Sequence, residues 1–469
     1  MQYFCRKLFL LSMKFLNPKY TKASLTLALP VMLTPVVQVS VNLFDNIIVG
    51  KLLGAQALAS VSLGNAVFFS IFVFALGFSF AIPPLVSEAH SQEKHSVINS
   101  VFRHGFVINL GIGLLLMIVL LLCLPLLYHM DQPKEIIPDT IGFLGIMTLS
   151  ILPFMVFQTL REVSEGLSYT LGVTKATIIA NVINIILNYV FIKGMFGIAP
   201  MGVEGSALAS LIARIFMMVF LYYVLLKEPK TRRYIKDFSL KVAGFSKEMF
   251  TKMLKIGFPT SLQMFFEVTA FAAAAFICGL VSSKDIASHQ IALSMASFTF
   301  NLCIGFSVAS TVMIGRKLGE KNYTELKEVG INNMKLVFIF MFACGVFFIL
   351  GRHILPTFFT KKEDVEVIQL AAKLMIIAAL FQLSDGVQVV ALGCLRGIQD
   401  VKIPSIITFI AYWVITIPLG YILCVPLKMG AFGMWIALGL GLTVSAVLLV
   451  IRFLKLSQRK IEMGKSSSF

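Results

Sequence analysis

The stretch "LPVMLTPVVQVSVNLFDNIIVG", residues 29–50, is apolar enough to lie in a lipid bilayer, yet it carries the carboxylate of Asp45. A charged side chain at the centre of a membrane helix costs about 2.5–3.5 kcal/mol on insertion scales. Such residues usually face a bundle interior or a water-filled cavity, and they mark ion or substrate pathways. The stretch therefore predicts a membrane helix that carries a functional acid. The same segment contains Pro30 and Pro35, which interrupt the helical hydrogen bonds and predict a bend.

The whole chain has the composition of a polytopic membrane protein. Of its 469 residues, 58% are hydrophobic and 13% are charged, with a mean hydropathy of +0.89. A soluble protein carries about twice this charged fraction. Apolar stretches long enough to cross a bilayer as a helix recur throughout, which predicts an all-α membrane protein. Twelve spans fit the pattern, at residues 24–49, 58–83, 102–128, 138–160, 168–194, 202–226, 254–280, 286–312, 331–355, 366–391, 403–425 and 430–454.

The net charge of +17 follows the positive-inside rule and does not indicate nucleic-acid binding. Basic residues gather in alternate loops, above all in Lys227–Lys252 and in the C-terminal "RFLKLSQRK". This pattern predicts that both termini are cytoplasmic, in a multi-pass protein of the plasma or inner membrane.

Several chemistries are disfavoured by missing motifs. The seven cysteines form no CxxC pair, so neither a zinc site nor a disulfide framework is indicated. The sequence has no GxxxxGK[ST], HExxH or GxSxG motif, which argues against an ATP-driven pump and an intramembrane hydrolase. We therefore expect neither an enzyme nor a cofactor.

The second half of the chain repeats the first at a nearly constant shift in numbering. "GFS" at residues 77–79 returns at 305–307, "SQEKH" at 91–95 aligns with "GEKNY" at 319–323, and "MGVEGSALA" at 201–209 aligns with "MGAFGMWIA" at 429–437. These three matches share a shift of 228, and Pro30 aligns with Pro259 at a shift of 229. Each half contains an even number of spans, so both halves should have the same orientation, related by a two-fold axis along the membrane normal with a cavity between them.

The repeat also predicts how the chain is divided. The expected segments are a cytoplasmic N-terminal segment at 1–22, an N-lobe at 23–226, a cytoplasmic connector at 227–250, a C-lobe at 251–455 and a cytoplasmic tail at 456–469.

Two acidic residues lie deep in spans of the second half. Glu267 is in the middle of span 7, and Asp385 is in the middle of span 10. Around Asp385 a polar stripe on one helix face is predicted by the spacing of Phe381, Gln382 and Gln388. We expect the carboxyl groups of Glu267 and Asp385 to be close enough to share one cation or one proton.

Other polar residues leave alternatives open. Asn184 and Asn188 form an i,i+4 pair on span 5, either as part of a site or as a helix–helix hydrogen bond. Asp45 lies near the outer end of span 1, either as a coupling residue or as a wet interfacial one. Arg214 is expected to snorkel or to pair internally in preference to binding substrate, and His289 to be interfacial or hydrogen-bonded in preference to being a ligand.

Three stretches, at residues 27–69, 287–320 and 381–404, together resemble the multidrug and toxic compound extrusion (MATE) family in its NorM-like branch. They include "LPVMLTPVVQVSVNLFDNIIVG", "ASHQIALSMASF" and "FQLSDGVQVVALGCLRGIQDVKIP". The resemblance covers nearly the whole chain. It implies a V-shaped bundle of 12 helices in two lobes that exports organic cations, such as drugs, dyes and toxic compounds, in exchange for Na⁺ or H⁺.

The resemblance also implies roles for single residues. Asp45, Glu267 and Asp385 match the acidic coupling residues, the last two forming a C-lobe site for Na⁺ or a proton. Asn184 and Asn188 match a polar pair near Asp45, with Gln382 and Gln388 as further supporting groups. Substrate-cavity candidates are Phe381, Gln263 and Phe266. Phe381 departs from the pattern, because this branch often has a tyrosine there. The implied partners are small cationic substrates, the coupling ion and membrane lipids, and we expect a monomer.

Two other function classes compete with this interpretation. A lipid-linked glycan flippase would carry anionic pyrophosphate headgroups and would need cavity arginines, whereas Arg214 is a lone basic residue at mid-span. A membrane assembly factor or a lipid-modifying enzyme would leave the repeat and the buried acids unexplained.

Overall fold

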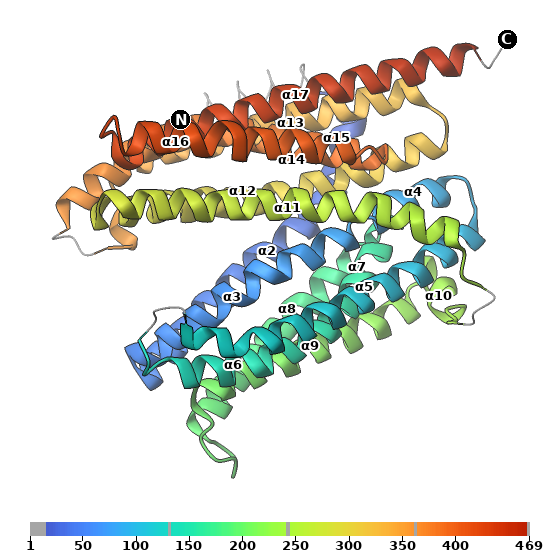
Figure 1. Cartoon of the computed structure of the whole chain (residues 1–469). Coiled ribbons are helices and arrows are strands. Elements are labelled where there is room, and N and C mark those ends of the chain that lie inside the picture. Colours follow the sequence, from blue (N-terminus) through green and yellow to red (C-terminus); the bar gives the residue numbers. More distant parts are fainter. Residues whose placement is uncertain (1–15, 130–132, 241–243, 361–363, 467–469) are drawn as a thin grey trace. The chain divides into compact units, whose positions relative to one another are not determined.

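Every regular element in the described part of the chain is a helix (Figure 1). The computed structural model describes residues 16–129, 133–240, 244–360 and 364–466, except for the side chains of residues 35, 36, 38–44, 46 and 55. The predicted all-α class is confirmed.

The helices are labelled as in Figure 1. Those of the first half are α2 (Pro18–Leu53), α3 (Ala55–Ser79), α4 (Ile82–Ser91), α5 (His95–Cys123), η1 (Leu124–His129), α6 (Ile137–Leu149), α7 (Ile151–Gly166), α8 (Leu171–Lys193), α9 (Gly202–Lys227) and α10 (Pro229–Lys236). Those of the second half are α11 (Lys247–Val281), α12 (Ser283–Gly319), α13 (Tyr323–Gly351), η3 (Leu355–Phe358), α14 (Val365–Gly397), α15 (Lys402–Phe409), η4 (Ile410–Thr416), α16 (Ile417–Cys424) and α17 (Gly430–Ser466).

The number of membrane spans agrees with the prediction. Within the described ranges, 11 helical stretches are long and apolar enough to cross a membrane. Helix α2, with 36 residues, supplies the twelfth on its length and sequence. The chain is therefore a multi-pass membrane protein. Helix α17 continues to Ser466, well past the predicted end of the last span at residue 454.

The chain forms two compact units. The N-unit is Leu33–Ser261, and the C-unit combines the chain up to Met32 with Leu262–Phe469. Both boundaries fall inside long helices, after Met32 in α2 and after Ser261 in α11. The predicted segment limits at 226 and 251, the V shape and the two-fold axis stay predictions.

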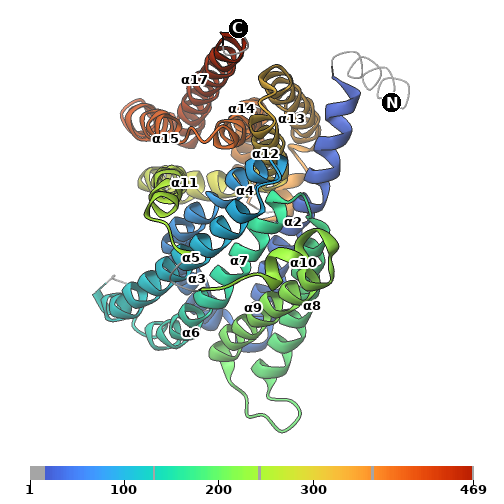
Figure 2. The same cartoon turned by 90° about the vertical axis from the view of Figure 1, so that its right-hand side faces the viewer.

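In the N-unit, α9 is the central helix. It packs against α6, α7 and α8, while α7 also packs against α5 (Figure 2). Three alanines of α9 are buried, and their small side chains allow neighbouring helices to approach closely: Ala207, Ala209 and Ala213. The more polar residues of the same helix, such as Ser206 and Ser210, remain free to line a cavity.

In the C-unit, α14 is the central helix. It packs against α12, α13 and α17. Two apolar clusters hold these helices together, one around Phe306, Val337 and Phe453 and the other around Phe381 and Trp435. Phe381 of the predicted stripe of α14 belongs to the second cluster, and the polar residues of the stripe are buried beside it.

The repeated "GFS" motif makes equivalent close contacts in the two units. A Cβ atom added at Gly77 of α3 would overlap the backbone of Ser261 in α11, and one added at Gly305 of α12 would overlap Met32 and the carbonyl of Ala28 in α2. The shift in numbering from Gly77 to Gly305 is 228, and the shift from Met32 to Ser261 is 229. The repeat in sequence is thus a repeat in packing, and it explains why glycine is required at both positions.

One span contains a π-helical segment. Between α15 and α16, residues Ile410–Thr416 form η4, which Pro418 follows near the start of α16. Proline has no backbone N–H, and its ring clashes with the carbonyl four residues earlier, so the wider π turn accommodates it. Such π segments often occur at functional sites, and this one carries Tyr412 into the core.

Candidate functional site

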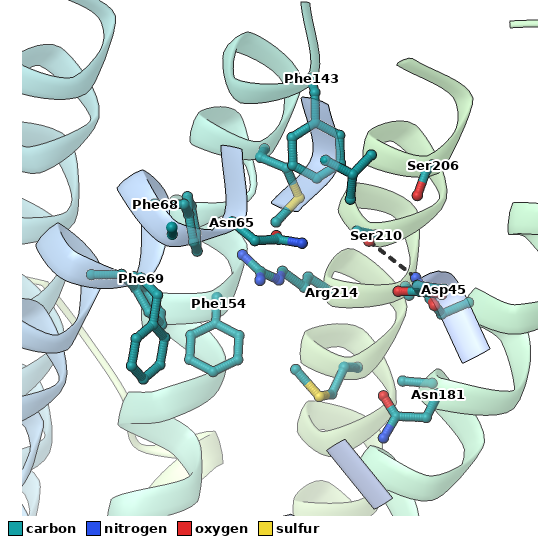
Figure 3. Close-up of a pocket in the computed structure, with 18 of the residues that line it drawn as sticks. Asp45, Asn65, Phe68, Phe69, Phe143, Phe154, Asn181, Ser206, Ser210 and Arg214 are labelled. Carbon is teal, nitrogen blue, oxygen red and sulfur yellow. Dashed lines mark hydrogen bonds between the residues drawn. The ribbon is translucent and has the colours of Figure 1, made fainter. Parts of the chain in front are cut away.

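The N-unit contains a cavity of about 660 Å³ that includes Asp45 (Figure 3). Its walls come from α2, α3, α6, α7, α8 and α9. One part is aromatic, formed by Phe68, Phe69, Phe72, Phe143 and Phe154. The polar part contains Asp45, Ser62, Asn65, Asn181, Asn184, Ser206, Ser210 and Arg214.

Asp45 is held by Asn188, one member of the predicted asparagine pair. The side-chain amide of Asn188 on α8 donates a hydrogen bond of 2.5 Å to the Asp45 carboxylate. Asn188 is fully buried, and Asp45 is partly buried at the cavity wall. The structure therefore brings Asp45 and Asn188 together at the cavity wall, and the role of Asp45 as a coupling residue stays a prediction.

Asn184 lines the same cavity, but in the described contacts it forms no hydrogen bond with Asp45. Its amide nitrogen donates to the hydroxyl of Ser210 on α9 over 3.2 Å, drawn as the dashed line in Figure 3. Its carbonyl oxygen and the amide nitrogen of Asn181 have no hydrogen-bond partner in the described structure. Buried polar atoms are normally paired, so these two atoms are free to bind water or a guest in the cavity.

Arg214 also reaches the cavity from α9. It donates a hydrogen bond of 2.6 Å to the hydroxyl of Ser150, and its guanidinium group lies over the rings of Phe68, Phe72 and Phe154 at 5.0, 5.9 and 5.2 Å. It thus has an internal partner, one of the two predicted outcomes. The aromatic partners come from α3 and α7, and no local sequence pattern predicts them.

The second site lies in the C-unit around Glu267 on α11. The hydroxyl of Tyr412 donates to the Glu267 carboxylate over 3.4 Å, and Gln263, one turn earlier, also hydrogen-bonds this carboxylate. Tyr412 and Gln263 are both buried. Glu267 is thus held between one residue of its own helix and one from the π-helical segment.

Asp385 lies on α14 and interacts electrostatically with Glu267, while the sharing of one cation or proton by the two groups stays a prediction. It is buried, as are Phe381, Gln382 and Gln388, so the predicted stripe faces the interior. The Gln388 amide donates to the Tyr412 hydroxyl over 3.1 Å. A chain of hydrogen bonds therefore runs from α14 through Tyr412 to Glu267 on α11.

Gln382 is fully engaged in helix packing. Its side-chain oxygen accepts from the hydroxyl of Thr299 over 3.1 Å, and its nitrogen donates to the backbone oxygen of Met341 over 3.3 Å. It therefore holds α14 against α12 and α13.

The predicted substrate-cavity residues of the C-unit lie close to these acids. Phe381 is buried against Trp435 and Phe271, with ring centroids 5.4 and 6.3 Å away. The ring of Phe266 packs on Phe409 at 4.9 Å, and its backbone oxygen accepts a hydrogen bond from the indole of Trp413. Their contact with a substrate stays a prediction.

In the described structure, His289 does not form the hydrogen bond that is one of its two predicted outcomes. It is fully buried, with its ring 5.9 Å from that of Trp435, and neither ring nitrogen has a hydrogen-bond partner in the described structure. It is therefore not hydrogen-bonded in the described contacts, and an interfacial depth in the membrane stays a prediction. It lies in the second turn of α12 against Trp435, which itself belongs to the apolar cluster, and its burial follows from tertiary packing.

The two prolines of the first span lie inside one continuous helix. Helix α2 runs through both Pro30 and Pro35. The side chain of Pro35 lies outside the described residues, and the proposed bending of α2 stays a prediction.

Tyr412 is the main site residue that the sequence does not reveal. It lies in an apolar span whose polar residues at helical spacing are only the threonines Thr408 and Thr416, and the π-helical segment changes which face it occupies. Pro418 within that span is the only available signal that the helix is irregular there.

The donor set of the C-unit fits a hard cation or a proton. Among the described residues no group of three or more His, Cys, Asp or Glu side chains is placed to hold a metal ion. The two carboxylates are instead accompanied by the hydroxyl of Tyr412 and the amides of Gln263 and Gln388. Oxygen donors of this kind are the ligands that hard cations prefer.

Comparison with known proteins gives a family that covers both units. The MatE family model matches residues 30–190 and again residues 259–422. The starts of the two matches, at positions 30 and 259, differ by the same shift of 229 that relates Pro30 to Pro259 in the internal repeat. The duplication inferred from the sequence is thus also seen as two successive matches to the same family model.

Individual relatives match nearly the whole chain. The chain is 32% identical over 456 residues to "Probable multidrug resistance protein NorM" of Agrobacterium fabrum, covering 95% of this chain and 96% of that protein. It is 33% identical to "Multidrug resistance protein NorM" of Photobacterium profundum, covering 92% and 94%. A crystal structure of a MATE protein in complex with MaL6 shares the fold, with a TM-score of 0.85, 21% identity and coverage of 94% and 97%. The chain belongs to the MATE family of membrane transporters, in its NorM-like branch.

Proposed function

We propose that the protein is a secondary active multidrug exporter. It extrudes organic cations in antiport with Na⁺ or H⁺ by alternating access, as the family and its NorM relatives indicate. The observation that carries the proposal is the acidic pair of the C-unit. Asp385 is buried and interacts electrostatically with the partly buried Glu267, and Tyr412 connects Glu267 by hydrogen bonds to Gln388 on the helix of Asp385. Such a pair is unfavourable unless its charge is periodically neutralised.

Glu267 and Asp385 are the proposed coupling site. Two nearby carboxylates in a low-dielectric environment cannot both remain charged and unpaired. Entry of one Na⁺ or one H⁺ relieves this repulsion. The inward movement of one charge releases about 2.3 kcal/mol per 100 mV of membrane potential, which is available to drive export.

The N-unit cavity is the proposed substrate site, with Asp45 as its acidic group. Its volume of about 660 Å³ lies in the range of small-molecule sites, and its walls combine an aromatic part with a polar part. Occupation of the cavity and bending of α2 at its prolines are proposed to depend on the charge state of Asp45.

We further propose that the protein resides in the plasma or inner membrane with both termini cytoplasmic. The alternation of basic loops supports this orientation. Exposed apolar side chains such as Leu122 and Leu350, 73% and 76% exposed, support contact with lipid. A monomer is proposed as the working state.

The proposal is tested by dye accumulation in cells. Cells that express the protein should retain less of a cationic dye than cells that carry an empty vector, and collapse of the ion gradients should remove the difference. Equal retention in expressing and empty-vector cells, at verified membrane expression, would contradict the proposal.

A further inference from the structure

Arg214 is an unusual residue for a cavity that accepts cations. It lies near the middle of α9, about 18 Å from the first residue of the helix at 1.5 Å per residue. In the described part of the chain it forms no ion pair, and its one hydrogen bond goes to the neutral hydroxyl of Ser150. A charge at this depth without an anionic partner is costly, and such residues mark functional sites.

The surroundings of Arg214 fix the guanidinium group without neutralising it. The rings of Phe68, Phe72 and Phe154 lie within 5.9 Å of its central carbon, and cation–π contact orients a guanidinium plane. Ser150 binds one of its nitrogens. The charge therefore remains available to a ligand at the cavity wall, already held in place before the ligand arrives.

Asp45 does not provide the missing anion. It lines the same cavity, but no ion pair joins it to Arg214, and its described hydrogen bond goes to Asn188. In Figure 3 the Arg214 guanidinium points toward Phe68 and Phe154, whereas Asp45 lies beside Ser210, away from these rings. The cavity therefore has two separate charged regions of opposite sign.

We propose that the N-unit cavity selects aromatic compounds that carry a carboxylate, with the carboxylate bound by Arg214. The guanidinium group offers parallel N–H donors that match the two oxygens of a carboxylate. The adjacent rings provide an apolar surface for the aromatic part of the ligand, and Asn65, drawn beside Arg214 in Figure 3, adds an amide. This substrate class rests on the proposed export function and narrows it.

The competing explanation is that Arg214 only connects α9 with α3 and α7. It predicts that Arg214 contributes to stability but not to ligand choice. A matched pair of ligands separates the two explanations without any substitution. A rhodamine dye with a free benzoate group and the methyl ester of the same dye differ only in the carboxylate.

The experiment measures binding of both dyes to the purified protein by fluorescence polarisation. We expect the wild-type protein to bind the free acid about tenfold more tightly than the ester, as a charge-assisted hydrogen-bonded pair implies. Arg214→Gln should abolish this preference and leave ester binding within about twofold of wild type. Arg233→Gln, which changes an exposed arginine of α10, is the matched control and should retain the preference.

Further variants keep the test valid if Arg214→Gln does not fold. Ser150→Ala retains the charge but removes its hydrogen bond, and should reduce the preference for the acid. Arg214→Lys keeps the positive charge but lacks the planar pair of N–H donors, and should retain only part of the preference for the acid. Equal wild-type affinity for acid and ester, or an unchanged preference in folded Arg214→Gln, would overturn the proposal.

The result is distinguishable from a failure of the export function. If cells expressing the wild-type protein do not extrude the ester, the proposed function fails. If they extrude the ester while the purified protein shows no preference for the acid, export stands and the inference about Arg214 is wrong.

Discussion

The hydroxyl of Tyr412 donates a hydrogen bond of 3.4 Å to the carboxylate of Glu267, although the two residues are 145 positions apart in the chain. Tyr412 in turn accepts a hydrogen bond from Gln388, one turn after Asp385 on α14. The π-helical segment η4 therefore connects the two acidic helices of the C-unit. If Glu267 is a coupling residue, as proposed, a change of its charge is expected to act on this irregular segment through Tyr412.

Tyr412→Phe should weaken ion coupling without loss of fold. The substitution keeps the ring in the core but removes the hydroxyl that bridges Gln388 and Glu267. A hydrogen bond is worth about 1 kcal/mol, so the ion concentration for half-maximal efflux should change about fivefold. Tyr421→Phe, at a 47% exposed position of α16, is the control. An unchanged ion dependence in Tyr412→Phe would show that the bridge has no role in coupling.

Glu267→Gln should abolish ion-driven efflux and leave the protein folded. Glutamine keeps the shape of the side chain and an oxygen that accepts from Tyr412, but it neither binds a proton nor carries charge. Efflux of a cationic dye and the thermal unfolding temperature are measured together. The matched control is Glu366→Gln, at a surface ion pair with Lys284 where the glutamate is 81% exposed, and it should retain full activity. Normal efflux by Glu267→Gln would refute its role in coupling.

Asp45→Asn should abolish resistance to a cationic dye at normal membrane expression. The substitution removes the charge from the cavity wall, while asparagine still accepts a hydrogen bond from Asn188. Growth of cells across dye concentrations provides the measurement. Asp139→Asn, at an exposed position of α6, should be silent. Full resistance with Asp45→Asn would reduce Asp45 to a structural residue.

Gly77→Ala should destabilise the N-unit by about 1–3 kcal/mol, because the added methyl group meets the backbone of Ser261. Gly439→Ala is the opposite case, since a Cβ atom there meets nothing within 4 Å. It should be neutral or slightly stabilising, as alanine favours helices over glycine. Thermal unfolding of the purified variants compares the two. Equal unfolding temperatures would contradict the close approach of α3 and α11.

The parts of the fold that depend on periodicity were predictable from the sequence. Long apolar stretches require helices in lipid, because every backbone polar group must be satisfied within the segment. The spacing of three residues predicts that Asp385 and Gln388 lie on one face of α14, and the structure confirms that both are buried. The i,i+4 spacing likewise indicated that Asn184 and Asn188 share a face of α8.

The remaining features depend on tertiary contacts that no local pattern encodes. Tyr412 reaches Glu267 only because η4 is π-helical. Arg214 finds its aromatic partners on helices far away in sequence. Because histidine is polar, His289 would be expected near water, but the packing of α12 buries it against Trp435.

The most direct test of the central claim is dye transport by purified protein in sealed lipid vesicles, with Na⁺ and proton gradients imposed separately. We predict that a gradient of one of these ions drives a cationic dye across the membrane against its own gradient, and that Glu267→Gln protein does not. If neither gradient moves the dye in vesicles that contain folded wild-type protein, or if Glu267→Gln transports as well as wild type, the account of a cation-coupled exporter is contradicted.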